Sequence, residues 1–129
     1  KNVLERIPDN LWFGTGPDTM AYAGIEPFTR YDEALDTMIV AYIDTAHNEY
    51  LNILYHQGVF ALAAYLAALF SAAWRWVKQS RENAGAAVFG AATLCYCIQA
   101  FFGISMCITA PFFWLTLALL DGCCGYKKI

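Results

Sequence analysis

Three long apolar runs in the second half of the chain constrain its fold more than any other sequence feature. Residues 55–74, YHQGVFALAAYLAALFSAAW, contain no Asp, Glu, Lys or Arg. A helix of about 20 apolar residues crosses the hydrocarbon core of a bilayer, which is about 30 Å thick. Residues 84–102 have Gln99 as their one strongly polar side chain, and residues 104–120 have none. The sequence therefore predicts an all-α, polytopic integral membrane protein with three transmembrane helices.

The composition argues against a soluble domain. Of the 129 residues, 59% are hydrophobic and 15% are charged, against about 45–50% and 25% in soluble proteins. A chain of this length lacks the volume to enclose three helices that are apolar on every side. The net charge of -3 and the scattered basic residues disfavour a nucleic-acid partner. The five cysteines neither pair evenly nor show C-x2-C spacing, so we expect no disulfide framework and no metal site.

Basic residues predict the orientation of the three spans, which we place at about 48–74, 84–102 and 104–120. Residues 75–83 and 121–129 carry Lys and Arg, which favours the cytoplasmic side. Residues 1–47 then form a structured extracytoplasmic loop, with a short helix expected around residues 31–42. Because the chain opens without Met and its first apolar run comes late, we expect it to be the C-terminal part of a longer protein.

The segment DTAHNEYLNILYHQG, residues 44–58, leads a polar cluster directly into the first span. Asp44 or Thr45 is a plausible N-cap, and the following residues favour helix. We therefore predict one uninterrupted helix from this cap to Trp74.

His47 and Gly58 are eleven residues apart, close to three helical turns, so the predicted helix presents both on one face. An imidazole near the membrane surface suits proton transfer, and Asn48 adds hydrogen-bonding capacity for a substrate. The alternative is a capping or solvated loop histidine. His56 falls on the opposite face and is expected to be an interfacial or packed residue.

Two further features of the loop bear on function. FGTGPDT, residues 13–19, lacks the Lys-Ser/Thr of a P-loop and the third glycine of a dinucleotide fingerprint, so Gly14 and Gly16 predict a tight turn. Arg6 and Arg30 are the only arginines of the loop and are candidates for binding an anion such as a diphosphate. The alternative for both is a local ion pair with neighbouring acids.

Taken in order, FGTGPDT, AHNEYLNILYHQG and the later QAFFGIS and APFFWLTLALL give the chain a family resemblance. It resembles the C-terminal conserved region of the O-antigen ligase and O-antigen polymerase family of bacterial membrane glycosyltransferases. The most specific part of the pattern is His47-x10-Gly58, and the resemblance covers nearly the whole chain.

The resemblance implies a multi-pass enzyme of the bacterial plasma (inner) membrane with its active face outside the cytoplasm. Its donor would be an undecaprenyl-diphosphate-linked glycan and its acceptor a second glycan, without metal or cofactor. His47 would deprotonate the acceptor hydroxyl, which displaces the lipid diphosphate with inversion. The family's arginines match no position here and are expected upstream of Lys1, with the missing N-terminal helices, so this part alone should be inactive.

The resemblance does not separate ligase from polymerase, and two other classes remain open. One is a fragment of a lipid-linked glycan transporter, which would need polar groups in mid-membrane, where the sequence offers little beyond Gln99. The other is a non-catalytic membrane scaffold, which would tolerate loss of His47.

Overall fold

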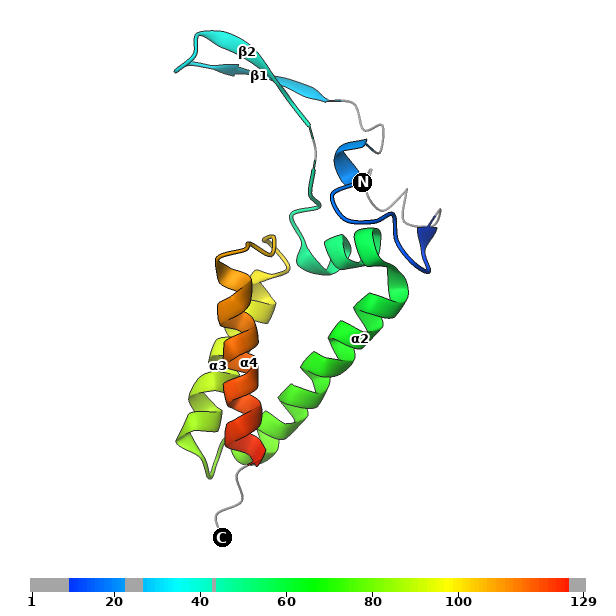
Figure 1. Ribbon diagram of the computed structural model, residues 1–129. Coiled ribbons are helices and arrows are strands. Elements are labelled where there is room, and N and C mark those ends of the chain that lie inside the picture. Colours follow the sequence, from blue (N-terminus) through cyan, green and yellow to red (C-terminus); the bar gives the residue numbers. More distant parts are fainter. Residues whose placement is uncertain (1–9, 23–26, 43, 126–129) are drawn as a thin grey trace.

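The computed structural model describes residues 10–22, 27–42 and 44–125. Its elements, in chain order, are η2 (Met20–Tyr22), β1 (Phe28–Asp32), β2 (Thr37–Ala41), α2 (Glu49–Gln79), α3 (Ala84–Gln99) and α4 (Thr109–Gly125). The helices α3 and α4 run alongside each other, α2 descends towards their lower ends, and the two strands project beyond the opposite end (Figure 1). The fold is mostly helical, and the strands correct the all-α expectation.

The strands β1 and β2 form an antiparallel hairpin where a short helix was predicted. The register runs from Phe28 opposite Ala41 to Asp32 opposite Thr37. The helix-favouring residues between the strands supply only the turn, which the Asp32 carboxylate stabilises by accepting the N–H of Ala34 at 2.9 Å and of Leu35 at 3.2 Å. The flanking β-branched and aromatic residues favour strand, and this preference decides the local structure.

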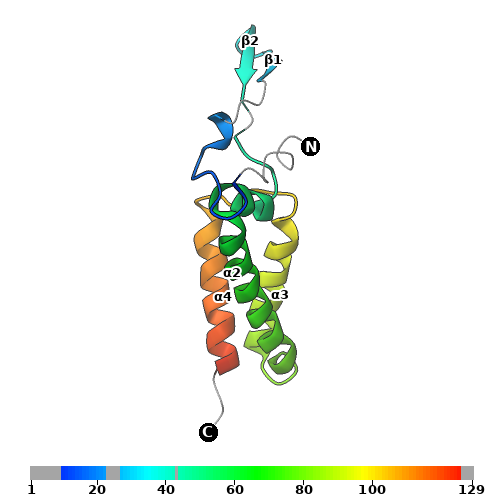
Figure 2. The ribbon, with the colours of Figure 1, turned by 90° about the vertical axis from the view of Figure 1, so that its right-hand side faces the viewer.

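The helix α2 begins later than predicted and is broken. Its N-cap is Asn48, whose side chain accepts the N–H of Leu51, so neither Asp44 nor Thr45 caps it. At Gly58 the backbone leaves the helical region, with φ 83° and ψ -179°. The prediction of an uninterrupted helix is therefore wrong. Residues 49–57 cross the upper end of the molecule, and residues 59–79 turn downwards (Figures 1 and 2).

The other two helices differ in their bounds from the predicted spans. α3 ends at Gln99, which is exposed at the helix end and not in mid-span, and α4 begins at Thr109. Pro111 lies in the first turn of α4, where its missing N–H costs no hydrogen bond. Hydropathy alone does not detect this start signal.

Among the described residues, α2 is the one helix both long and apolar enough to cross a membrane. α3 and α4 are apolar but shorter, with 16 and 17 residues. Only 11% of the most apolar window of α2 is buried within the chain. Phe60, Phe70 and Trp74 are all more than half exposed.

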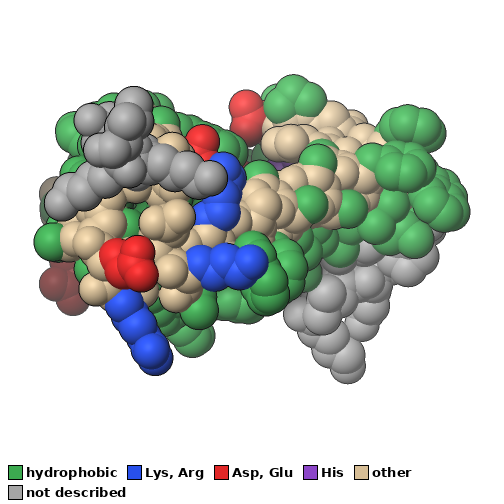
Figure 3. Space-filling view, turned by 90° about the horizontal axis from the view of Figure 1, so that it is seen from below, with side chains coloured by type: hydrophobic (Ala, Val, Ile, Leu, Met, Phe, Trp, Pro, Cys, Tyr) green, Lys and Arg blue, Asp and Glu red, His purple; other side chains and the backbone are tan. Residues whose placement is uncertain are grey.

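The three helices pack most closely where the C-terminal ends of α2 and α4 meet the start of α3. The core there consists of Ala72, Ala86, Leu120 and Cys124. Gly90 is buried against the Trp76 ring, which leaves no room for a Cβ. Lys and Arg side chains gather on this end (Figure 3), and Arg75 pairs with Asp121 of α4.

Candidate functional site

Residues 10–19 form a loop that fills the break in α2, and we call it the loop clamp. The N–H of Val59 donates to the Leu11 carbonyl at 2.8 Å, and the Tyr55 carbonyl accepts the N–H of Thr15 at 2.9 Å. The His56 carbonyl accepts the N–H of Gly16 at 3.0 Å. In an unbroken helix the Tyr55 and His56 carbonyls would accept the N–H groups four residues later. The clamp therefore supplies hydrogen bonds that the break removes.

Glycines make this close approach possible. Gly14, Gly16 and Gly58 all have positive φ, at 70°, 100° and 83°. A Cβ on Gly14 would collide with the backbone of His56 and Gln57, and a Cβ on Gly58 would collide with the Trp12 carbonyl. Gly58 thus permits both the break in α2 and the close approach of the clamp.

His56 belongs to the same contact. Its Nδ1 lies 2.8 Å from the Gly16 carbonyl oxygen, and its half-buried ring meets Tyr55 edge-on, with centroids 5.1 Å apart. The carbonyl can only accept, so Nδ1 carries the proton. His56 is a packed residue that holds the clamp on α2.

His47 lies just outside α2, immediately before the N-cap. Its side chain is exposed, and its φ of 47° puts it in the left-handed region, uncommon for a residue other than glycine. Both neighbours are fixed: the N–H of Ala46 donates to Asn52 Oδ1 at 2.8 Å, and Asn48 caps the helix. Because His47 is not helical and α2 bends at Gly58, the two do not share a helix face, which corrects that prediction.

Asn48 uses both polar atoms of its side chain within the protein. Its Oδ1 accepts the N–H of Leu51 at 3.0 Å, and its Nδ2 donates to the Phe101 carbonyl at 3.1 Å. The structure therefore gives it a capping and tethering role. Its contact with a substrate stays a prediction.

A buried carboxylate, which sequence reasoning did not select, lies two residues after His47. Glu49 is 7% exposed. Its Oε1 accepts the hydroxyl of Tyr65 at 3.2 Å, and its Oε2 accepts that of Tyr96 at 3.0 Å. We call these three residues the Glu49 cluster. In sequence, an acid in a first turn indicates only a favourable helix dipole, and its partners lie 16 and 47 residues further on.

Of the two candidate anion-binding arginines, the structure places Arg30, and it lies on the hairpin. Arg30 is on β1, with its side chain 72% exposed and its Nη2 3.8 Å from Asp32 Oδ2, which matches the local ion pair left open above. Arg6 lies outside the described residues. The hairpin projects away from the start of α2 (Figure 1), so in this arrangement His47 and Arg30 belong to different parts of the segment that precedes α2.

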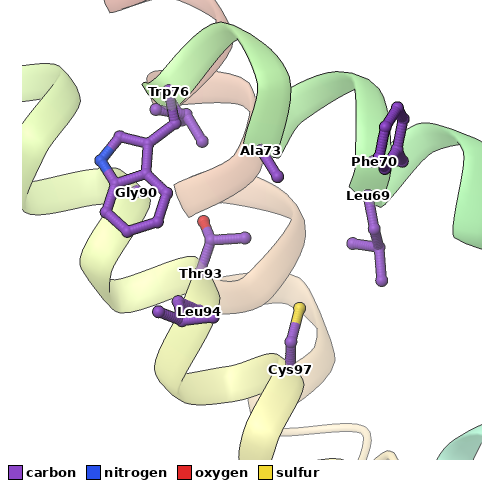
Figure 4. Close-up of a pocket in the computed structure, with 9 residues that line it drawn as sticks. Leu69, Phe70, Ala73, Trp76, Gly90, Thr93, Leu94 and Cys97 are labelled. Atoms are coloured by element: carbon purple, nitrogen blue, oxygen red, sulfur yellow. The ribbon is translucent and has the colours of Figure 1, made fainter. Parts of the chain in front are cut away.

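An apolar cavity of about 280 Å³ lies between α2 and α3 (Figure 4). Its lining contains no charged side chain; of its polar groups, the Thr93 hydroxyl already donates to the Phe89 carbonyl at 2.9 Å. It is lined by Leu69, Phe70, Ala73, Trp76, Gly90, Thr93, Leu94, Cys97 and Leu120. Such a lining offers contact area, and its one titratable side chain is the free thiol of Cys97.

Comparison of the chain with protein-family models, with curated proteins and with solved structures finds no match. Within residues 10–22, 27–42 and 44–125, no group of three His, Cys, Asp or Glu side chains is arranged to hold a metal ion. The site is therefore defined by its own geometry: an exposed imidazole just before α2, the Glu49 cluster that begins two residues later, and the loop clamp at the break in the same helix.

Proposed function

We propose that the chain is part of a membrane glycosyltransferase that moves a glycan from an undecaprenyl-diphosphate-linked donor to an acceptor glycan. The acceptor would be a growing polysaccharide or a lipid-anchored sugar. Two things support the proposal: the ordered resemblance of the sequence to the O-antigen ligase and polymerase family, and the presentation of His47.

The observation that carries the proposal is the fixed, exposed position of His47. A left-handed backbone at a residue other than glycine is held only where its surroundings determine it, and such residues concentrate at functional sites. Here Ala46 and Asn48 are both hydrogen-bonded to α2. The backbone of His47 is thus held in place before the substrate arrives, and it presents an exposed imidazole, a group suited to general base catalysis.

In the proposed reaction, the imidazole of His47 takes the proton from the acceptor hydroxyl. The hydroxyl oxygen attacks the anomeric carbon of the donor sugar, and the bond from that carbon to the diphosphate oxygen breaks with inversion. The lipid diphosphate leaves with the bonding electron pair and needs a nearby cation. Arg30, exposed apart from its weak pair with Asp32, and Arg6 are our candidates, together with arginines elsewhere in the intact protein.

The proposal puts α2, α3 and α4 in the plasma membrane, with the hairpin and the loop clamp outside. Residues 59–79 of α2 are about 30 Å long at 1.5 Å per residue, which matches the hydrocarbon core. The exposed apolar side chains of this segment would then face lipid or the other helices of the intact protein. The Lys and Arg side chains at the lower end would face the cytoplasm.

The test replaces His47 in the intact protein by Asn and, separately, by Gly. Both residues tolerate the left-handed backbone, so the substitutions remove the base without straining the loop. We expect His47→Asn to reduce glycan transfer by at least about 100-fold, a magnitude usual for a lost general base. Cell-surface polysaccharide banding on a gel and transfer in isolated membranes measure the loss.

Added imidazole provides the matched control. The His47→Gly protein leaves space for a free imidazole, which should restore part of the transfer, whereas the His47→Asn protein should respond less. Unchanged polysaccharide banding in both variants, with normal amounts of protein in the membrane, would show that His47 is no base. That outcome would favour the scaffold or the transporter.

A further inference from the structure

Three consecutive residues tie the start of α2 to the end of α3. The Asn48 side chain donates to the Phe101 carbonyl, the N–H of Glu49 donates to the Ala100 carbonyl at 2.9 Å, and the Tyr50 hydroxyl donates to the Cys97 carbonyl at 2.9 Å. The carbonyls at a helix C-terminus and the N–H groups at an N-terminus lack partners within their own helices. Here the start of α2 donates hydrogen bonds to the free carbonyls at the end of α3. The N-cap residue Asn48, which follows His47, is therefore held in place by α3.

The Glu49 cluster adds side-chain contacts to the same junction. One tyrosine comes from α2 beyond the break and the other from α3. The Tyr96 ring stacks on Phe113 of α4, with centroids 4.2 Å apart. α2 and α3 therefore meet at one carboxylate, whose two oxygens both accept hydroxyl hydrogen bonds, and α4 packs against the tyrosines that donate them.

A carboxylate suits this place better than an amide of the same shape. It accepts at both oxygens, whereas a glutamine has one acceptor oxygen and would direct an N–H₂ group at the second hydroxyl. Burying a carboxylate is costly unless hydrogen bonds compensate. The hydroxyls of Tyr65 and Tyr96 supply that compensation here.

We infer that Glu49 is a positioning residue for His47, holding the imidazole where the acceptor hydroxyl arrives; this rests on the proposed function. Only Asn48 separates the two residues. A rotation of the first turn of α2 that followed loss of the cluster would carry His47 with it. Displacing a reacting group by about 1 Å can cost about 100-fold in rate, so a smaller displacement should cost about tenfold.

The experiment uses Glu49→Gln and Tyr96→Phe in the intact protein, in membranes supplied with lipid-linked glycan extracted from the host. We expect kcat to fall about tenfold in each variant, while the KM for this donor stays unchanged. A loss confined to kcat indicates an interaction that matters in the transition state. Glu82→Gln and Tyr42→Phe make the same chemical changes at exposed positions and should leave kcat unaltered.

A second arm separates positioning from general stability. Glu49→Gln is added to the His47→Gly protein, and the transfer supported by free imidazole is measured. A diffusing base needs no positioning, so the added substitution should leave the imidazole-supported rate unchanged. If Glu49→Gln lowers that rate tenfold as well, or lowers the amount of extractable monodisperse protein in proportion to kcat, the residue acts on the fold and the inference is wrong.

The two hypotheses fail differently. Retained transfer in His47→Asn would overturn the proposed function. Loss of transfer in His47→Asn together with unaltered kcat in Glu49→Gln and Tyr96→Phe would overturn the positioning role alone. If imidazole restores no measurable rate, the division of the Glu49→Gln effect between kcat and KM decides, and a rise in KM alone counts against positioning.

Discussion

The loop clamp and the β1–β2 hairpin lie close together in sequence, yet they are held in opposite ways. The clamp is joined to α2 by three backbone hydrogen bonds and by the His56 ring. The hairpin is paired with itself, and several of its large apolar side chains are at least half exposed: Phe28, Tyr31, Leu35, Met38 and Val40. One of its few side-chain contacts, from the Tyr31 hydroxyl to Asp36, raises the pKa of Tyr31.

This difference indicates where chemistry can be carried out. A two-stranded hairpin is marginally stable by itself in water, so a side chain on it is poorly fixed. A residue at the start of α2 is held in place by the Glu49 cluster and by hydrogen bonds to the end of α3. We therefore propose that His47 transfers the proton and that Arg30 makes at most electrostatic contact with the substrate.

Gly58→Ala should have the largest effect among the substitutions that test this difference between the loop clamp and the hairpin. Its backbone conformation is one that only glycine adopts readily, and a Cβ would meet the Trp12 carbonyl. We expect a loss of about 3 kcal/mol, combining backbone strain with the collision, and release of the loop clamp. Thermal unfolding of the intact protein in detergent measures it.

Gly122→Ala is the matched control for this substitution. Gly122 lies within α4, and nothing lies within 4 Å of an added Cβ. Alanine favours helix over glycine by about 1 kcal/mol, so the control should be neutral or stabilising. A Gly58→Ala protein as stable as this control would show that the clamp does not depend on the break.

The sequence predicted those features of the fold that are encoded within one short segment, and it missed those that depend on contacts between distant residues. The apolar runs and the tight turn at Gly14 and Gly16 are visible in single segments, and the structure has three helices and positive φ at both glycines. The break at Gly58 is stabilised by a loop more than forty residues earlier, which no helical periodicity reveals. Glu49 was missed for the same reason, since its partners come from beyond the break and from α3. The catalytic assignment of His47 and the membrane location remain predictions.

A smaller effect distinguishes two N-caps that are alike in geometry. Asn48 caps α2 and donates to Phe101, while Asn83 caps α3 and donates to the Cys123 carbonyl at 2.9 Å. Replacing either by Ala should destabilise the protein by about 1–2 kcal/mol, from the lost cap and tether. Only Asn48→Ala should also lower kcat, because only this cap adjoins His47. Equal transfer rates per folded molecule in the two variants would show that the start of α2 does not position His47.

The smallest effect on stability is expected from Arg30→Ala on the hairpin. An exposed ion pair contributes at most about 1 kcal/mol and often nothing measurable, so the unfolding temperature should hardly change. If the exposed guanidinium contacts the donor diphosphate, the KM for the lipid-linked glycan should rise several-fold while kcat stays constant, since such binding is shared by ground and transition states. Arg81→Ala removes an exposed arginine from the turn that follows the C-terminal end of α2 and should leave KM unchanged. A lower kcat in Arg30→Ala would instead mean that the hairpin folds over His47 during the reaction. The distinction between a fixed catalytic region at the start of α2 and a loosely held binding region on the hairpin would then be wrong.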